Sequence, residues 1–226
     1  MEAIILAGGF GTRLKHIVSD VPKPMAPVTG QPFLEFIMKY LLINGVNKVV
    51  LAVGYKANII QDYFGNNYHG IRIAYSIEDT PLGTGGAIRK ALDSCNDDDV
   101  FIINGDTYFD VDLHKMKTFH TEMDSDLTVA IKSMSNFERY GSVVIEGNLI
   151  REFKEKKPTI KGRINGGIYL IKKKLMNLVD KESFSFEKVI LESHMVDTYA
   201  FESDGYFIDI GVPEDYYKAQ KDFELV

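Results

Sequence analysis

Short apolar runs alternate with longer segments of helical period through the first half of the chain. Four runs rich in β-branched residues predict buried strands, at Ile4–Leu6, Lys48–Val53, Ile71–Tyr75 and Val100–Asn104. Between them, apolar residues recur at helical spacing in Phe33–Ile43, Ala57–Phe64 and Thr84–Ser94. This alternation predicts a largely parallel sheet in an α/β fold, with helices covering both faces. Ligands bind such sheets at the carboxyl ends of the strands, so the loops there are the place to look for chemistry.

The pattern changes after about residue 126. Four strand-like segments lie close together, at Leu127–Lys132, Ser142–Glu146, Leu149–Phe153 and Gly166–Ile171. Glu146-Gly147-Asn148 fits a hairpin turn between the second and third of them. These segments predict a mixed sheet region built onto the parallel core. Because no linker rich in Pro, Gly or Ser divides the chain, we expect residues 1–226 to form a single domain.

Composition excludes several classes of protein. The 226 residues carry a formal net charge of −6, which argues against a nucleic-acid partner, since neutralising phosphates requires a basic surface. A single cysteine, Cys95, rules out an intrachain disulfide and is expected to be a buried apolar residue. The N-terminal apolar run is short and lacks a basic flank, and no other stretch could span a bilayer. We therefore expect a cytoplasmic protein without a membrane partner.

The loop after the first strand is rich in glycine. It reads Ala7-Gly8-Gly9-Phe10-Gly11-Thr12-Arg13-Leu14, and its backbone amides could surround a phosphate. Neither of the two common phosphate-loop patterns fits, because Leu14 replaces the third Rossmann glycine and the P-loop Gly-Lys-Ser/Thr is missing. Alone, such a turn could be a simple strand-to-helix connection. Arg13 within the loop, and Lys23 held between Pro22 and Pro24, favour an anion site.

This two-part pattern resembles the sugar-phosphate nucleotidyltransferase family. Its Gly-Gly-x-Gly-Thr-Arg-Leu and Pro-Lys-Pro elements stand here as Gly8–Leu14 and Pro22–Pro24, although His16 occupies a place where the family often has proline. The resemblance extends over nearly the whole chain and implies a Rossmann-like, mostly parallel or mixed sheet, the nucleotide-diphospho-sugar transferase fold. It also implies a Mg²⁺-dependent reaction of a nucleoside triphosphate with a sugar 1-phosphate. The nucleotide-binding part would be about residues 1–125 and the sugar-phosphate part about 126–226.

Two acidic positions are candidates for metal binding. Asp106 follows the predicted strand Val100–Asn104, where a carboxylate suits Mg²⁺. Taken alone, it is better explained as a turn aspartate that caps the next segment. The resemblance implies that Asp106 and Asp209 together hold the catalytic metal. The alternative metal motif Asp110-Val111-Asp112 would suit a glycosyltransferase, but Asp112 is better explained as an N-terminal helix residue.

The resemblance also implies a nucleotide site around the glycine-rich loop and the segment Pro81–Ala87. Glu78 precedes that segment, and its carboxylate could accept hydrogen bonds from both N1–H and the 2-amino group of guanine. An exposed glutamate at a strand end is an equally good explanation. The expected nucleotide-binding residues are Leu6, Ala7, Gly8, Gly9, Gly11, Thr12, Arg13, Glu78, Gly83 and Thr84.

Three elements resemble the family's sugar-phosphate site. Lys156, or its neighbour Lys157, matches a Glu-Lys element whose lysine reaches the substrate phosphate. Asn165 and Gly166 match an element that contacts sugar hydroxyls and are expected to begin a strand. Glu187 matches a sugar-site Ser-x-Glu-Lys element, although first-turn acidity after a Ser185 N-cap would explain it as well.

These elements lead to one functional hypothesis and several alternatives. Arg13, Lys23 and Asp106 are the expected catalytic residues, with Arg13 on the leaving pyrophosphate and Lys23 on the α-phosphate. Within the family, Val18–Pro27 and Ile77–Ile88 most resemble enzymes that use GTP and a D-glycero-D-manno-heptose 1-phosphate. Hexose 1-phosphate enzymes, a non-catalytic binding subunit and a glycosyltransferase remain alternatives. The sequence leaves open whether the protein forms a homodimer. His120 and Glu122 lie in a polar stretch and are expected at the surface.

Overall fold

The computed structural model describes residues 1–9, 14, 18 and 20–225. Its centre is a set of parallel strands, in which β1 (Glu2–Leu6) lies between β4 (Lys48–Val53) and β7 (Asp99–Asn104). Beyond β4, β6 (Ile71–Ile77) continues the parallel set, and β5 (Asn67–Tyr68) pairs with it in the antiparallel sense. The alternating apolar segments thus form the parallel core that the sequence predicts.

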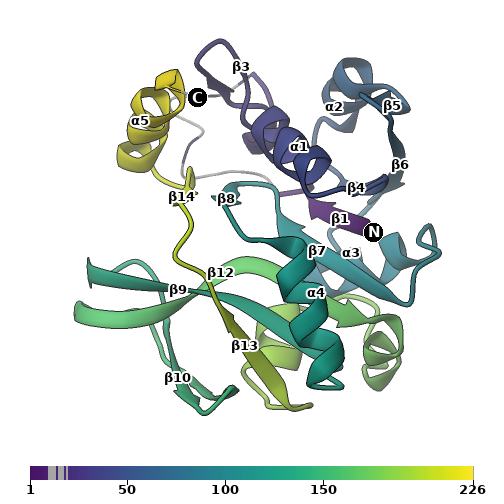
Figure 1. The fold of residues 1–226 in the computed structure, drawn as a ribbon. Coiled ribbons are helices and arrows are strands. Elements are labelled where there is room, and N and C mark those ends of the chain that lie inside the picture. Colours follow the sequence, from purple (N-terminus) through teal and green to yellow (C-terminus); the bar gives the residue numbers. More distant parts are fainter. Residues whose placement is uncertain (10–13, 15–17, 19, 226) are drawn as a thin grey trace.

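Helices cover both faces of these strands (Figure 1). On one face pack α1 (Phe33–Ile43), α2 (Ala57–Phe64), α4 (Leu113–Glu122) and α5 (Pro213–Asp222). On the other face pack α3 (Gly83–Leu92), the 3-10 helix Lys173–Leu178 and the π-helix Glu187–Leu191. The period of two within a strand creates these two cores, because Ile5 faces the first group of helices and Ile4 the second.

The second half adds five strands to the same ten-stranded sheet, which pair antiparallel except for the parallel pair of β9 and β13. They are β9 (Leu127–Phe137), β10 (Ser142–Glu146), β11 (Leu149–Phe153), β12 (Thr159–Lys172) and β13 (Thr198–Glu202). β12 joins the two halves, because it pairs with β7 on one side and β9 on the other. β10 pairs with both β11 and β12, so the five strands close on themselves. The β10–β11 turn lies at Gly147-Asn148, within the turn that the sequence predicts.

Two short strand pairs lie outside the ten-stranded sheet. β8 (Thr107–Phe109) pairs with β14 (Phe207–Asp209), and β2 (Pro27–Val28) pairs with β3 (Gln31–Pro32). The β2–β3 hairpin follows the 3-10 helix Lys23–Met25, and α5 continues into the 3-10 helix Phe223–Leu225. Helix α5 docks on the hairpin, since Tyr216 Oη and Gln220 Nε2 donate to the Pro27 carbonyl at 2.6 and 2.7 Å. The C-terminal helix therefore holds the segment that follows Lys23.

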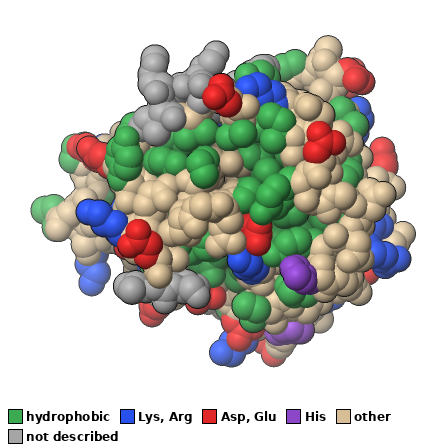
Figure 2. All heavy atoms as spheres, turned by 90° about the horizontal axis from the view of Figure 1, so that it is seen from above, with side chains coloured by type: hydrophobic (Ala, Val, Ile, Leu, Met, Phe, Trp, Pro, Cys, Tyr) green, Lys and Arg blue, Asp and Glu red, His purple; other side chains and the backbone are tan. Residues whose placement is uncertain are grey.

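The exposure of individual side chains tests further predictions from the sequence. The face that lies uppermost in Figure 1 carries acidic and basic side chains scattered among hydrophobic and uncharged ones (Figure 2). Within the described part of the chain, no helix has the length and apolar character needed to cross a bilayer. Cys95 is buried, as predicted. The prediction for His120 is wrong, because α4 turns this side chain inward, where Thr128 Oγ1 lies 2.8 Å from Nδ1; Glu122 is exposed.

Candidate active site

The carboxyl ends of β1, β4, β6 and β7 meet at one edge of the sheet and border a cleft of about 650 Å³. This nucleotide cleft, as we call it, is lined by six of the expected nucleotide-binding residues: Leu6, Gly8, Gly9, Glu78, Gly83 and Thr84. Ala7 lies buried behind the wall, where its amide donates to the Ala52 carbonyl at 2.8 Å. Gly11, Thr12 and Arg13 lie outside the described residues.

Glu78 lies beside the glycine-rich loop at the entrance to this cleft. One carboxylate oxygen, Oε2, accepts a hydrogen bond from the Leu82 amide at 3.1 Å. The other, Oε1, lies so near Gly8 that a Cβ at that position would come within 2.7 Å of it. Glycine at position 8 therefore allows the carboxylate to approach the loop backbone. The contact with Leu82 ties Glu78 to the turn that precedes α3, so the side chain has a structural role whatever else it binds.

Asp106 and Asp209 both lie within 4.0 Å of the Lys23 ammonium. Lys23 Nζ forms an ion pair with Asp106 Oδ2 and lies 4.0 Å from Asp209 Oδ1. Asp106 is placed by Gly105, whose amide donates to the Leu6 carbonyl at 3.0 Å, and its own carbonyl accepts from the Ile210 amide at 3.0 Å. The folded chain thus brings together three of the four residues for which the sequence predicts catalysis or metal binding. The fourth, Arg13, lies outside the described residues.

The chemistry of these carboxylates fits a divalent metal ion. Asp106 and Asp209 offer hard oxygen donors, and the Lys23 ammonium close to both marks a place where this chain already holds positive charge. Among the described residues that line the nucleotide cleft, Lys23 is basic and four are acidic: Glu78, Asp79, Asp106 and Glu187. A nucleoside triphosphate is strongly anionic and would be repelled by these carboxylates. Binding of the triphosphate therefore requires further positive charge, which a metal ion can supply.

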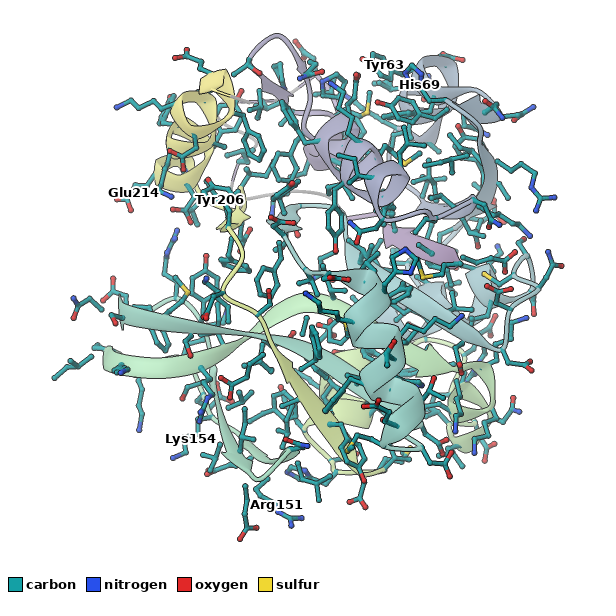
Figure 3. The ribbon with its side chains drawn as sticks, in the orientation of Figure 1. Tyr63, His69, Arg151, Lys154, Tyr206 and Glu214 are labelled. Carbon is teal, nitrogen blue, oxygen red and sulfur yellow. The ribbon has the colours of Figure 1, made fainter. Side chains whose placement is uncertain are left out.

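A second cleft of about 510 Å³ adjoins the first. The two share Asn104 and Glu187 as lining residues, while Asp106 lines the first cleft and Asp209 the second. Lys156 is exposed and lines the second cleft, whereas Lys157 is not among its lining residues. Lys154, at the end of β11, also lines this cleft, and Figure 3 labels it on the β10–β11 side of the molecule.

Asn165 and Gly166 lie in the middle of β12, not at the start of a strand as predicted. The pairing of β12 with β9 becomes irregular between Asn165 and Tyr169, which lets Asn165 face the second cleft. Asn165 Nδ2 donates to Tyr169 Oη at 2.9 Å, and its Oδ1 accepts from the Gly167 amide at 2.9 Å. A Cβ on Gly166 would come within 2.4 Å of the Phe109 ring, so this close approach requires glycine.

Glu187 stands between the two clefts, in the first turn of the π-helix Glu187–Leu191. Its Oε2 accepts from Thr84 Oγ1 at 2.6 Å and from Ser185 Oγ at 2.8 Å. Ser185 Oγ also accepts from the Lys188 amide at 3.2 Å. Ser185 thus makes the capping contact that the sequence offers as a structural explanation for Glu187. The same carboxylate nevertheless lines both clefts. A role at the start of the helix is therefore compatible with a role in the sugar site.

The alternative metal motif has another explanation. Asp112 is the N-cap of α4 and its Oδ1 accepts from the Lys115 amide at 3.0 Å, which confirms the prediction of an N-terminal helix residue. Asp110 is exposed, and neither Asp110 nor Asp112 lines the two clefts. Among the described residues that line the clefts, Asp106 and Asp209 are instead the carboxylates that lie within 4.0 Å of the Lys23 ammonium.

Comparison with known proteins identifies the family. The sequence pattern of the family described as Nucleotidyl transferase matches residues 2–225. The chain belongs to this family. It is 51% identical, over 99% of both chains, to the D-glycero-alpha-D-manno-heptose 1-phosphate guanylyltransferase of Aneurinibacillus thermoaerophilus. It is 50% identical to the protein of the same name from Campylobacter jejuni, over 96% of this chain and 97% of that one.

Solved structures of other nucleotidyl transferases share the fold. A crystal structure of HddC from Yersinia pseudotuberculosis complexed with GMP-PN is 40% identical and superposes with a TM-score of 0.89, covering 98% of this chain and 99% of that chain. A UTP-bound UGPase from Acinetobacter baumannii is only 19% identical, yet has a TM-score of 0.84 over 99% of this chain and 93% of that one. The predicted mixed α/β nucleotidyltransferase fold is therefore confirmed.

Sequence reasoning missed Arg139 in this nucleotidyl transferase. Arg139 lines the second cleft, and its guanidinium forms an ion pair with Asp215 in the first turn of α5. Tyr140 lies under the guanidinium, 5.7 Å from ring centroid to Arg139 Cζ, and burial raises the pKa of its phenol. Arg139-Tyr140-Gly141 directly before the strand Ser142–Glu146 was the available signal, but nothing in the sequence alone connects Arg139 to Asp215.

Proposed function

We propose that this protein transfers the guanylyl group of GTP to D-glycero-α-D-manno-heptose 1-phosphate, giving GDP-heptose and pyrophosphate. The observation that carries the proposal is the identity of about half of the residues, over the full chain, to two proteins that bear the name of this activity. A structural relative with a TM-score of 0.89 was solved with a guanine nucleotide analogue, GMP-PN. Two adjoining clefts, one lined by Asp106 and the other by Asp209, support the proposal because such a reaction needs two substrate sites.

The reaction needs no covalent intermediate with the protein. An oxygen of the sugar 1-phosphate attacks the α-phosphorus of GTP and forms the new P–O bond. The bond from the α-phosphorus to the oxygen bridging the α- and β-phosphates breaks, and pyrophosphate leaves with that electron pair. Because nucleophile and target are both anionic, the work of the protein is to position them and to neutralise charge.

We assign the residues to the two substrates on this basis. The nucleotide cleft binds GTP through the glycine-rich loop, Glu78 and Gly83, with Lys23 on the α-phosphate and Arg13 on the leaving pyrophosphate. The second cleft binds the sugar 1-phosphate, with Lys156 on its phosphate and Asn165, Gly166 and Glu187 beside the sugar. Asp106 and Asp209 hold Mg²⁺, which, when bound, neutralises phosphate charge and polarises the reacting phosphoryl group.

The division of the chain supports the same assignment. The nucleotide cleft takes its lining from residues 6–106 together with Glu187 and Gly211. The second cleft takes its lining from residues 104–212. Apart from Asn104 and Thr107 in the second cleft and Glu187 and Gly211 in the first, this distribution supports a nucleotide-binding part of about residues 1–125 and a sugar-phosphate part of about 126–226 within one domain.

The decisive experiment measures pyrophosphate release with GTP, UTP, CTP, dTTP and ATP, each paired with heptose, mannose and glucose 1-phosphates. We expect release with GTP and the manno-configured heptose, abolished by a chelator and restored by Mg²⁺. Release with another pair would keep the reaction class but contradict the assigned substrates. A folded protein that releases no pyrophosphate with any pair would favour a non-catalytic binding subunit, and transfer of a sugar without pyrophosphate release would indicate a glycosyltransferase.

A further inference from the structure

Thr84, expected from the sequence to bind nucleotide, directs its hydroxyl toward the sugar-phosphate side. Its Oγ1 donates to Glu187 Oε2 at 2.6 Å and accepts from the Phe186 amide at 2.8 Å. A hydroxyl has a single hydrogen to donate. That hydrogen is used by the segment Ser185–Glu187, so it is not offered to a ribose or phosphate in the nucleotide cleft.

The two donors to the Glu187 carboxylate bind the same oxygen atom. Thr84 Oγ1 and Ser185 Oγ, at 2.6 and 2.8 Å, both donate to Oε2. Among the described residues these are the side-chain donors to this carboxylate, so Oε1 keeps its acceptor capacity. Glu187 is only partly buried and lines both clefts. Fixing one oxygen sets the orientation of the whole group and presents the other to a ligand hydroxyl.

The backbone already holds the two segments together without these hydroxyls. The Phe184 amide donates to the Leu82 carbonyl, and the Gly85 amide donates to the Phe184 carbonyl, both at 2.9 Å. A Cβ on Gly85 would come within 2.1 Å of the Phe184 ring, which shows how closely the segments pack. The Thr84 hydroxyl therefore contributes mainly to the orientation of the carboxylate, and its loss should leave the fold intact.

We propose that Thr84 is a positioning residue for the sugar 1-phosphate, which acts by orienting the Glu187 carboxylate, and is not a side-chain ligand of the nucleotide. The proposal rests on the proposed function, since it names the substrate that the second cleft serves. In this arrangement the N-terminus of α3 borders the nucleotide while its Thr84 side chain sets the acceptor for sugar hydroxyls. Because the N-terminus of α3 contributes to both substrate sites, the geometry of one site depends on the other.

The test is steady-state kinetics of Thr84→Val, which keeps the shape of the side chain and removes the hydroxyl. A hydrogen bond to a charged group supports an expected rise of about tenfold in KM for the sugar 1-phosphate. KM for GTP should change by less than about twofold, and the melting temperature should stay near that of the wild type. Thr84→Ser keeps the hydroxyl and should restore KM for the sugar. Thr118→Val is the matched control, because Thr118 Oγ1 donates within α4 to the His114 carbonyl at 3.0 Å, and its kinetics should be those of the wild type.

A double-mutant cycle separates positioning from a general effect on structure. In a Glu187→Ala background, Thr84→Val should add little further loss, because the acceptor that the hydroxyl orients is already gone. Additive losses, a rise in KM for GTP alone, or no change in either KM would each overturn the proposal. Ser185→Ala, which removes the second donor to Oε2, should raise KM for the sugar in the same direction and provides an independent test should Thr84→Val fold poorly.

Failure of the proposed function is visible separately. Wild-type protein that does not release pyrophosphate from GTP and the heptose 1-phosphate contradicts that function before any variant is made. Calorimetric titration of the wild type and Thr84→Val with each sugar 1-phosphate then tests the positioning role without turnover. Equal affinities of the two proteins for every sugar phosphate that the wild type binds would overturn it.

Discussion

Lys23 forms an ion pair with Asp106, a residue 83 positions further along the chain. The lysine comes from the 3-10 helix Lys23–Met25, which α5 holds through the β2–β3 hairpin, and the aspartate follows the central strand β7. Asp209, 4.0 Å from the same ammonium, arrives on β14. One ammonium and two carboxylates from three separate segments thus form the centre on which the proposed chemistry depends.

Replacing Asp106 tests the acidic side of this centre. Asp106→Asn keeps the size of the side chain and removes its charge, so we expect kcat to fall at least about a hundredfold, in line with the loss of single charge-stabilising groups elsewhere. Pyrophosphate release at saturating substrates measures the change. Asp124→Asn is the control, because Asp124 is an exposed carboxylate paired with Lys172 at 2.9 Å. Activity of Asp106→Asn within a few fold of the wild type would remove Asp106 from the assignment.

Replacing Lys23 separates two roles of its ammonium. Lys23→Met keeps the length of the chain but removes the positive charge that lies beside Asp106 and Asp209. Since like charges repel, we expect Mg²⁺ to bind more tightly in the variant, while kcat falls about a hundredfold because the α-phosphate loses a cation. A Mg²⁺ titration of the rate measures both effects. If the Mg²⁺ concentration needed for half the maximal rate falls while kcat is unchanged, Lys23 only balances the charge of the two carboxylates.

Glu78→Gln tests recognition of the base. A carboxylate can accept hydrogen bonds from both N1–H and the 2-amino group of guanine, whereas an amide presents a donor to one of them. We expect kcat/KM for GTP to fall by roughly tenfold or more, as for the loss of a hydrogen bond to a charged group. Inosine triphosphate lacks the 2-amino group, so the preference for GTP over this analogue should narrow.

The outcome that contradicts the base-reading role of Glu78 is an equal loss with GTP and inosine triphosphate. It would mean that Glu78 acts only through its 3.1 Å contact with the Leu82 amide, by holding the turn before α3. Glu122→Gln, an exposed change on α4, should leave both rates unchanged.

Local patterns predicted much of the fold. Phe33–Ile43, Ala57–Phe64 and Lys48–Val53 have the predicted boundaries, because their apolar periods coincide with their buried faces. β12 is longer than predicted, since it begins at Thr159 in an exposed polar stretch that pairs with β9. Its strand character comes from long-range pairing, which no local window contains.

The position of a site residue could be predicted where the residue directly follows a strand. It could not be predicted where it depends on a contact between residues far apart in the sequence. Asp106 and Glu78 follow strands, so their place at the cleft follows from the topology. Arg139 was missed because its partner Asp215 is 76 residues away in sequence. The contact of Thr84 with Glu187 could not be predicted either, because it spans 103 positions and depends on how the π-helix packs against α3.

Arg139→Ala tests the cation that sequence reasoning missed. Arg139 lines the second cleft and is held by Asp215, so we expect KM for the sugar 1-phosphate to rise about tenfold through loss of a charge-assisted contact. Arg139→Lys should recover only part of this loss, because an ammonium cannot bind an anion and Asp215 through a planar fork. Arg151→Ala removes an exposed arginine paired with Glu146 at 2.9 Å and serves as the control. A change confined to KM for GTP would contradict the assignment to the sugar side.

His120 gives the protein a pH-dependent element of stability away from the clefts. Its ring is 1% exposed, and burial lowers the pKa of the imidazole from its ordinary value of 6.5. Thr128 Oγ1 contacts Nδ1, while Asp99 Oδ1, 3.8 Å from Nε2, and Asp126 oppose the shift and Lys117 and Lys172 reinforce it. Since the unfolded chain then binds more protons than the folded one, the free energy of unfolding rises with pH in this region. The contribution is complete above 6.5 and is lost as the pH falls through the lowered pKa of the folded state.

His120→Gln should therefore flatten this part of the stability profile. We expect urea denaturation of the wild type to give a smaller free energy of unfolding about one unit below pH 6.5 than about one unit above it, and a smaller difference in the variant. His114→Gln is the matched control, because His114 is an exposed histidine on the same helix and its removal should leave the wild-type difference in place. If His120→Gln keeps the full pH dependence, the titration of other groups must account for it, and the buried imidazole contributes packing and its contact with Thr128 alone.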